Sequence, residues 1–329
     1  MSRLKLLLGV AISLVLFAYL VWTVDIHELA AQLARTRWEW VLVGVVLSAL
    51  GPWTRGRRWW YLFPPGSNPP GLVPATMIGY MVNNVLPLRA GEFVRVYVVA
   101  RRWGHGFWTA LATLIVERVL DSLAIVLAMA VLVVRIPVPR TLEIGAVVLL
   151  AIDLVAVTVL VFLAVAPVPA RRIVERLSRR WPKLQGRLVK ILETFARGLL
   201  GIRTRAHLLP LVLWTMVIWI IQIAAAWTMF RALHLELPWI AAWAVLAFVG
   251  LGVAIPSAPG YIGVFHAAAT IALTIFGVSA TSAFGYALLF HATQIVPITV
   301  VGWIFLLREQ LSLADATRAR PIETSTWGA

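Results

Sequence analysis

Six long apolar runs divide this chain, and they leave room for little other than a helical fold embedded in a membrane. The runs cover residues 6–24, 38–53, 107–134, 144–165, 208–230 and 283–307. A helix of ~20 apolar residues crosses the ~30 Å hydrocarbon core of a bilayer. Only 13% of the residues are charged, against about 25% in a typical soluble domain. The sequence therefore predicts an all-α, polytopic membrane protein with six full spans.

Two further apolar stretches are interrupted too early to cross a bilayer. The first covers residues 72–86, stops at Pro87 and resumes over residues 91–100; the second covers residues 239–255, stops within residues 256–260 and resumes over residues 261–276. Irregular backbone at membrane depth is tolerated only where it lines a cavity or is buried in protein. We therefore predict two re-entrant helical hairpins, whose tips lie near Pro87–Gly91 and Pro256–Gly260.

Basic residues are concentrated between the apolar runs, and they predict the topology. The formal net charge is +15, and Lys and Arg are enriched on the cytoplasmic side of membrane proteins. Residues 55–58, 101–102 and 171–205 are the basic segments, so both termini are expected in the cytoplasm. In residues 183–199, apolar and basic residues are spaced so that they fall on opposite faces of a helix, which predicts an amphipathic helix on the inner leaflet. Anionic lipid, and not nucleic acid, is the partner that this pattern favours.

The two interrupted stretches share a motif, which suggests an internal repeat. Pro87-x-x-x-Gly91 and Pro256-x-x-x-Gly260 are separated by 169 residues. One transmembrane domain (1–329) would then contain a first repeat (1–140), a second repeat of opposite orientation (141–310) with the basic amphipathic segment 171–207, and a cytoplasmic tail (311–329). Inverted repeats with broken helices at the midplane are typical of alternating-access transporters. Two unrelated proline-kinked regions in an eight-span bundle are the alternative.

Charged residues at the first break form the main candidate site. Arg89, Glu92 and Arg95 follow Pro87 closely, and Glu92 and Arg95 are spaced to pair on a helix. Arg89 has no evident partner nearby, and its guanidinium suits a phosphate group. The helix that starts at Gly91 would add free N–H groups that favour an anion. The alternative is that these charges only extend to the membrane interface.

Polar residues on the neighbouring segments extend this candidate site. Asn83 and Asn84 precede the break and could cap the broken helix or contact a headgroup. Glu117, Arg118 and Asp121 lie inside an apolar run, where ionisable residues normally face the protein interior and pair. They could neutralise Arg89 and Arg95, relay protons or form a structural network.

The second hairpin carries fewer charges and is predicted to act as a gate. Its break and the arm that follows contain Pro256, Ser257, Pro259, Gly260, Tyr261 and His266, and the last run contains His291 and Gln294. A histidine there could titrate near neutral pH or could simply hydrogen-bond between helices. The chain has no cysteine, and no metal-ligand spacing, phosphate-binding loop or nucleophile elbow is recognisable. No cofactor or metal is expected.

Three motifs together resemble a known family. They are Asn84-x-x-Pro87-x-Arg89-x-Gly91-Glu92-x-x-Arg95, Glu117-Arg118-x-x-Asp121 and Pro256-x-x-Pro259-Gly260-x-x-Gly263. The chain is similar over nearly its whole length to the flippase-like transmembrane region of the lysylphosphatidylglycerol synthase/flippase family. The resemblance implies a bacterial or archaeal plasma-membrane protein that moves a lipid between leaflets. Family members that aminoacylate lipid carry a large soluble C-terminal domain, whereas here only residues 309–329 follow Arg308. Aminoacyl transfer by this chain alone is therefore not expected.

A lipid flippase is the function that these features favour. The headgroup phosphate would bind near Arg89 and Arg95, and the protein would not be an enzyme. A membrane-embedded transferase, which would use Glu92, Glu117 and Asp121, and a transporter of small solutes or ions are the alternatives. The expected partner is an anionic phospholipid; a homo-oligomer and a separate lipid-modifying enzyme are both compatible with the sequence.

Overall fold

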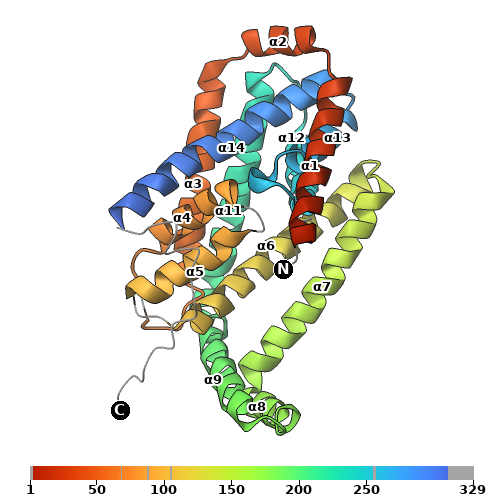
Figure 1. Cartoon of the computed structure of the whole chain (residues 1–329). Helices are drawn as coiled ribbons and strands as arrows, with labels where there is room; N and C mark the ends of the chain where they lie inside the picture. The colour runs from red at the N-terminus through yellow and green to blue at the C-terminus, as the bar shows by residue number, and fades with distance from the viewer. Residues whose placement is uncertain (1–2, 68, 87–88, 104–105, 255–256, 310–329) are drawn as a thin grey trace.

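The computed structural model describes residues 3–67, 69–86, 89–103, 106–254 and 257–309, and this part of the chain is helical without strands. Figure 1 shows the arrangement of the helices. Their bounds are α1 Arg3–Thr23, α2 Ile26–Ala34, α3 Trp38–Trp60, α4 Leu72–Val85, α5 Ala90–Trp103, α6 Phe107–Arg135, α7 Arg140–Val165, α8 Pro167–Leu177, α9 Pro182–Gly198, α10 Leu200–Arg203, α11 Arg205–Ala232, α12 Trp239–Gly252, the 3-10 turn η1 Pro259–Tyr261, α13 Val264–Thr274 and α14 Ala280–Arg308.

Several helices are long and apolar enough to cross a membrane. Within the described residues these are α7, α11 and α14, joined by a fourth if α1 and α2, which meet at 86°, are counted as one broken span. Two more helices, α3 and α6, have 23 and 29 residues but carry charged side chains in their interior. The chain is therefore a multi-pass protein embedded in the membrane, as the apolar runs predict.

Both interrupted stretches form pairs of short helices that pack together. The first hairpin consists of α4 and α5, and the second consists of α12 and α13 with η1 at the break. Close packing of the first pair depends on two glycines that face each other, Gly79 on α4 and Gly91 on α5. In the second pair, Gly252 lies against Ala268 and Val264. Pro87 and Pro256, which we expected to break these helices, lie outside the described residues.

Helices from the first and second halves of the chain pack on one another. The long helices α3 and α11 lie side by side along the middle of the molecule. The first hairpin helix α4 packs on α14, while α12 packs on α6. The short helix α2 packs on α14 at one end, and α9 packs on α6 at the opposite end. Each hairpin therefore contacts the final long helix of the other half.

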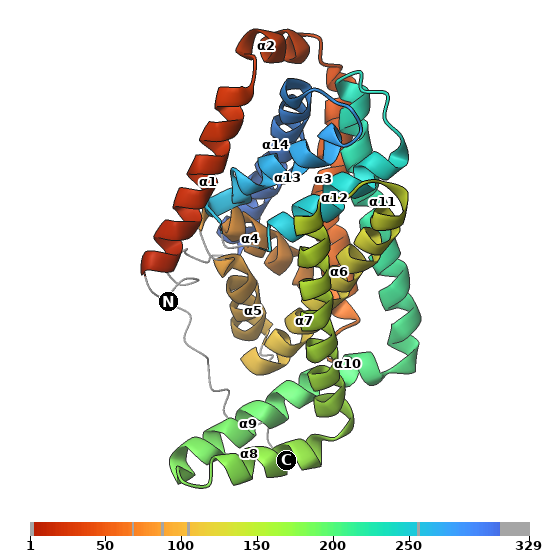
Figure 2. The ribbon, with the colours of Figure 1, turned by 90° about the vertical axis from the view of Figure 1, so that its right-hand side faces the viewer.

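The basic segment differs from the prediction in one respect. The predicted amphipathic helix exists as α9, but residues 167–177 form a separate helix, α8, that packs against it (Figure 2). Pro182 occupies the first turn of α9, where a missing N–H costs little, and it separates the two helices.

Arg171 on α8 pairs with Glu175 at 2.7 Å and with Glu193 at 2.9 Å. The hydrogen bond and charge of Glu175 raise the pKa of Arg171.

Candidate functional site

A buried charge cluster lies where α3, the first hairpin and α6 meet. Its members are Arg55 and Arg58 on α3, Glu92 and Arg95 on α5, Glu117, Arg118 and Asp121 on α6, and Arg89 just before α5. Glu117 lies ten residues into α6, about 15 Å from the start of that helix. The side chains of Arg58 and Glu117 are fully buried. The cluster therefore sits well within the helical body.

Glu117 and Asp121 each hold several arginines. Oε2 of Glu117 lies 2.8 Å from Nη2 of Arg95, and its Oε1 accepts from Nη2 of Arg118 at 2.5 Å. Oδ1 of Asp121 accepts from Nη2 of Arg58 at 2.7 Å, while its Oδ2 pairs with Arg55. Because the two carboxylates are one helical turn apart on α6, they tie α3, α5 and α6 together.

The cluster has more positive than negative charge. It contains five arginines and three carboxylates. The third carboxylate, that of Glu92, lies 3.5 Å from Arg118 and 4.0 Å from Arg89. Two positive charges are thus in excess. In addition, Nε of Arg58, Arg95 and Arg118 is buried without a hydrogen-bond partner within the described part of the chain. Charges at membrane depth are costly unless they are paired, so this arrangement favours an anion.

The first hairpin places a small cavity beside the cluster. The cavity is lined by Gly79, Tyr80, Asn83, Gly91, Glu92, Arg95 and Arg118. Oδ1 of Asn83 accepts a hydrogen bond from the N–H of Gly91 at 2.8 Å, which links the two arms. This N–H, which we expected to be free for an anion, is therefore used by the protein. Asn84 donates to Oγ1 of Thr299 on α14 at 2.9 Å.

The tips of the two hairpins meet. Nη2 of Arg89 donates to the carbonyl oxygen of Val253 at 2.7 Å, and its guanidinium lies 5.9 Å from the ring centroid of Tyr261. Arg89 and Tyr261 both have positive φ, at 53° and 59°, which is uncommon outside glycine. The contact corrects our expectation that Arg89 lacks a partner. It also couples the charge cluster to the second hairpin.

Two histidines lie behind the second break. His266 on α13 and His291 on α14 are buried, and their ring centroids are 4.6 Å apart. Nε2 of His291 is 2.7 Å from the carbonyl oxygen of Gly260, and Nδ1 of His266 accepts from the N–H of Gly263 at 3.3 Å. The pair therefore holds the backbone around η1. Ser257 is buried nearby, and Gln294 donates instead to Ser48 on α3 at 2.7 Å.

The structure groups most of the predicted residues but changes their pairing. Arg95 pairs with Glu117 and not with Glu92, because α5 turns its guanidinium toward α6 and over the ring of Trp59 at 4.6 Å. The expected contact between Arg118 and Asp121 is present at 3.4 Å. Glu117 neutralises Arg95 as expected, whereas Arg89 reaches across to the second hairpin.

Sequence reasoning missed Arg55 and Arg58. The apolar run ends at residue 53 and predicts that both arginines flank a span on its cytoplasmic side, but α3 continues to Trp60 and Arg58 is completely buried. Their pairing with Asp121 offsets part of the desolvation cost that would otherwise keep them at the membrane interface. A signal exists in the spacing: Val41, Gly44, Ser48 and Gly51 are buried at intervals of three and four, and residues 55 and 58 continue the same helix face.

Together, the fold and the cluster define a multi-pass helical membrane protein with a buried, positively charged site. Over residues 6–302 the sequence matches the family described as the lysylphosphatidylglycerol synthase TM region. The chain belongs to this family, whose domain is associated with membrane lipid, and the resemblance found in its motifs is confirmed. No curated protein matches the chain, and no solved structure does.

Proposed function

We propose that this protein moves a lipid with an anionic headgroup between the leaflets of a prokaryotic inner membrane. The observation that carries the proposal is the excess of two positive charges in the cluster, next to the junction of the two hairpin tips. Phosphate is the anion that membrane lipids supply, and guanidinium groups bind it bidentately. Membership of a lipid-associated membrane family supports the same substrate class.

Alternating access would follow from an inverted repeat of six full spans and two re-entrant hairpins. The order α1–α6 would correspond to α7–α14, with α3 matched to α11 and the hairpins matched to each other. Reciprocal packing of α4 on α14 and of α12 on α6 supports this pairing. Both termini would lie in the cytoplasm. Rocking of one half against the other would open the cluster to each leaflet in turn.

Within the cluster, Arg89 and Arg118 are the groups that an entering headgroup would reach first. Their side chains are 39% and 30% exposed, whereas that of Arg95 is 3% exposed. Bound phosphate would compete with Glu92 for both arginines and release the contact between Arg89 and Val253. Headgroup binding would thereby loosen the tip junction. The second hairpin, which contributes the ring of Tyr261 and the carbonyl oxygen of Val253 to this junction, would serve as the gate.

Replacing Arg89 with alanine is the test. A hydrogen bond to a charged group contributes about 1.5–3 kcal/mol, so transport of a headgroup-labelled anionic lipid in proteoliposomes should fall by about ten- to a hundredfold. Glu92→Ala should also alter the rate, because it removes the group that competes with phosphate. Arg140→Ala is the control, since Arg140 pairs with Glu143 on the surface and takes part in none of the ion pairs of the cluster. Equal rates for wild type, Arg89→Ala and Glu92→Ala across a broad lipid panel would contradict the proposal.

We further propose that the activity is transport without a chemical step. The carboxylates of Glu117 and Asp121 are occupied by arginines, which supports a binding role over acid–base catalysis. Recovery of the lipid unchanged after transport is expected. Divalent-metal-dependent formation of a modified lipid would instead support a membrane-embedded transferase.

A further inference from the structure

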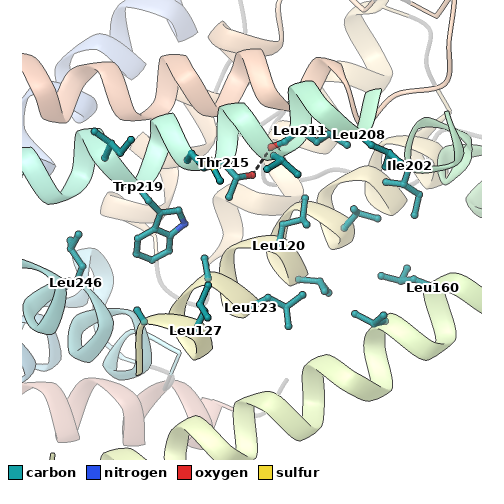
Figure 3. Close-up of a pocket in the computed structure, with 18 of the residues that line it drawn as sticks. Leu120, Leu123, Leu127, Leu160, Ile202, Leu208, Leu211, Thr215, Trp219 and Leu246 are labelled. Carbon is teal, nitrogen blue, oxygen red and sulfur yellow. Dashed lines mark hydrogen bonds between the residues drawn. The ribbon is translucent and has the colours of Figure 1, made fainter. Parts of the chain in front are cut away.

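An apolar groove runs between α6, α7 and α11, next to the charge cluster. Its volume is about 920 Å³, and side chains such as Leu120, Leu123, Leu160 and Leu211 point into it (Figure 3). A volume of this size is in the range of ligand pockets, about 300–1,000 Å³. The lining residues Val116 and Leu120 lie one residue before and three residues after Glu117 on α6, so the groove and the cluster share this helix.

Of the buried side-chain nitrogen and oxygen atoms that line the groove, one has no hydrogen-bond partner within the described residues. Thr215 lines it, but its hydroxyl donates to the carbonyl oxygen of Leu211 at 2.7 Å and accepts from Arg58 at 3.2 Å. Trp219 is different: Nε1 of its indole is buried and has no hydrogen-bond partner within the described residues. Figure 3 shows the ring projecting from α11 into the groove. Buried tryptophan N–H groups normally find an acceptor, so an acceptor is missing here.

The position of Trp219 relates the groove to the charge cluster. Thr215 contacts Arg58, a member of the cluster, and Trp219 follows Thr215 by one helical turn, about 5–6 Å along α11. A donor for a neutral carbonyl thus lies one turn along α11 from the contact with the arginine-rich cluster, within a hydrocarbon-lined space. A glycerophospholipid has the same order of groups: phosphate, ester carbonyl and acyl chain.

We propose that this groove holds an acyl chain of an ester-linked glycerolipid and that Trp219 donates its indole N–H to the ester carbonyl oxygen. The inference rests on the proposed lipid transport, and it assigns the lipid class and a second contact point. A transmembrane helix of a second copy would fill the same space less well, because its backbone carbonyls are already bonded within the helix and leave the indole without an acceptor. An ether-linked lipid lacks the carbonyl as well.

The test compares diester and diether phospholipids with the same headgroup and chains. A neutral hydrogen bond is worth about three- to tenfold in affinity, so wild-type protein in detergent should bind the diester lipid more tightly by that factor. Trp219→Phe keeps an aromatic side chain but removes the N–H, and it should abolish the preference. Trp214→Phe is the matched control: Trp214 lies on the same helix but packs edge-on against Trp53, away from the groove. It should keep the preference.

A second variant protects the test against a folding defect in Trp219→Phe. Leu123→Trp fills the groove from α6 and should prevent cross-linking of a diester phospholipid that carries a diazirine on its acyl chain. In wild type, the cross-links should map to lining residues of α6 and α11. No ester preference in wild type, or cross-links confined to other surfaces or to a second protein copy, would overturn the proposal. The binding and cross-linking assays do not depend on transport. Lipid binding in the groove of a protein that transports no lipid would reject the proposed transport function alone. Lipid transport without a preference for the diester lipid would reject the proposed role of the groove.

Discussion

Replacing Arg58 with methionine should destabilise the protein by about 3–5 kcal/mol, the range found when one partner of a buried ion pair is removed. Arg58 is fully buried, donates to Asp121 at 2.7 Å and lies 3.8 Å from Glu117. Methionine fills a similar unbranched volume, so the loss would come from the charge and not from a cavity. The expected result is a lower unfolding temperature in detergent, together with weaker packing of α3 on α6.

Arg57→Met provides the matched control for this prediction. Arg57 is the adjacent residue on α3 and is exposed, so its replacement should change stability by no more than about 0.5 kcal/mol. Adding Asp121→Asn to Arg58→Met should not recover the loss, because Asp121 still pairs with Arg55 and lies 3.4 Å from Arg118. Equal unfolding temperatures for Arg58→Met and Arg57→Met would show that the cluster does not hold α3 in place.

The helices could be predicted from the sequence because their signals are local. Apolar runs and basic segments each act over fewer than 30 residues, and they predict the long helices and the two pairs of short helices, α4 with α5 and α12 with α13. Boundaries next to charged residues were less predictable. The run at 38–53 extends to Trp60 because Arg55 and Arg58 find a carboxylate on α6, 63 or more residues further along the chain. Hydropathy contains no information about such a partner.

The candidate site was predictable as a group of residues but not as a set of contacts. Proximity of Arg95 to Glu117 depends on the crossing of α5 and α6, and the contact of Arg89 with Val253 spans 164 residues. The groove beside Trp219 was not predictable from the sequence, since its walls come mainly from α6, α7 and α11 and resemble ordinary lipid-facing residues in the sequence. Tertiary contacts thus decide which charges bind one another and which remain available to a ligand.

Replacing Gly91 with alanine should disrupt the first hairpin more than its single added methyl group suggests. A Cβ at this position would overlap the carbonyl oxygen of Gly79 and lie 2.8 Å from Oδ1 of Asn83. The Gly79 backbone cannot move aside as the end of a flexible side chain can, so α4 and α5 would separate. Asn83 would then lose its hydrogen bond to the N–H of Gly91. Overpacking typically costs about 1–3 kcal/mol.

Lipid movement in proteoliposomes should fall further than stability in the Gly91→Ala variant, because the separation of α4 and α5 displaces Arg95 and Glu92 from their partners on α6. Gly186→Ala on α9 is the control, since a Cβ there meets nothing within 4 Å. Relief from the helix-interior cost of glycine should stabilise that variant by about 0.5–1 kcal/mol and leave transport unchanged. If Gly91→Ala transported lipid at the wild-type rate, close approach of the hairpin arms would not be required to position the charge cluster, and headgroup binding would have to rely on Arg55, Arg58 and Arg118 alone.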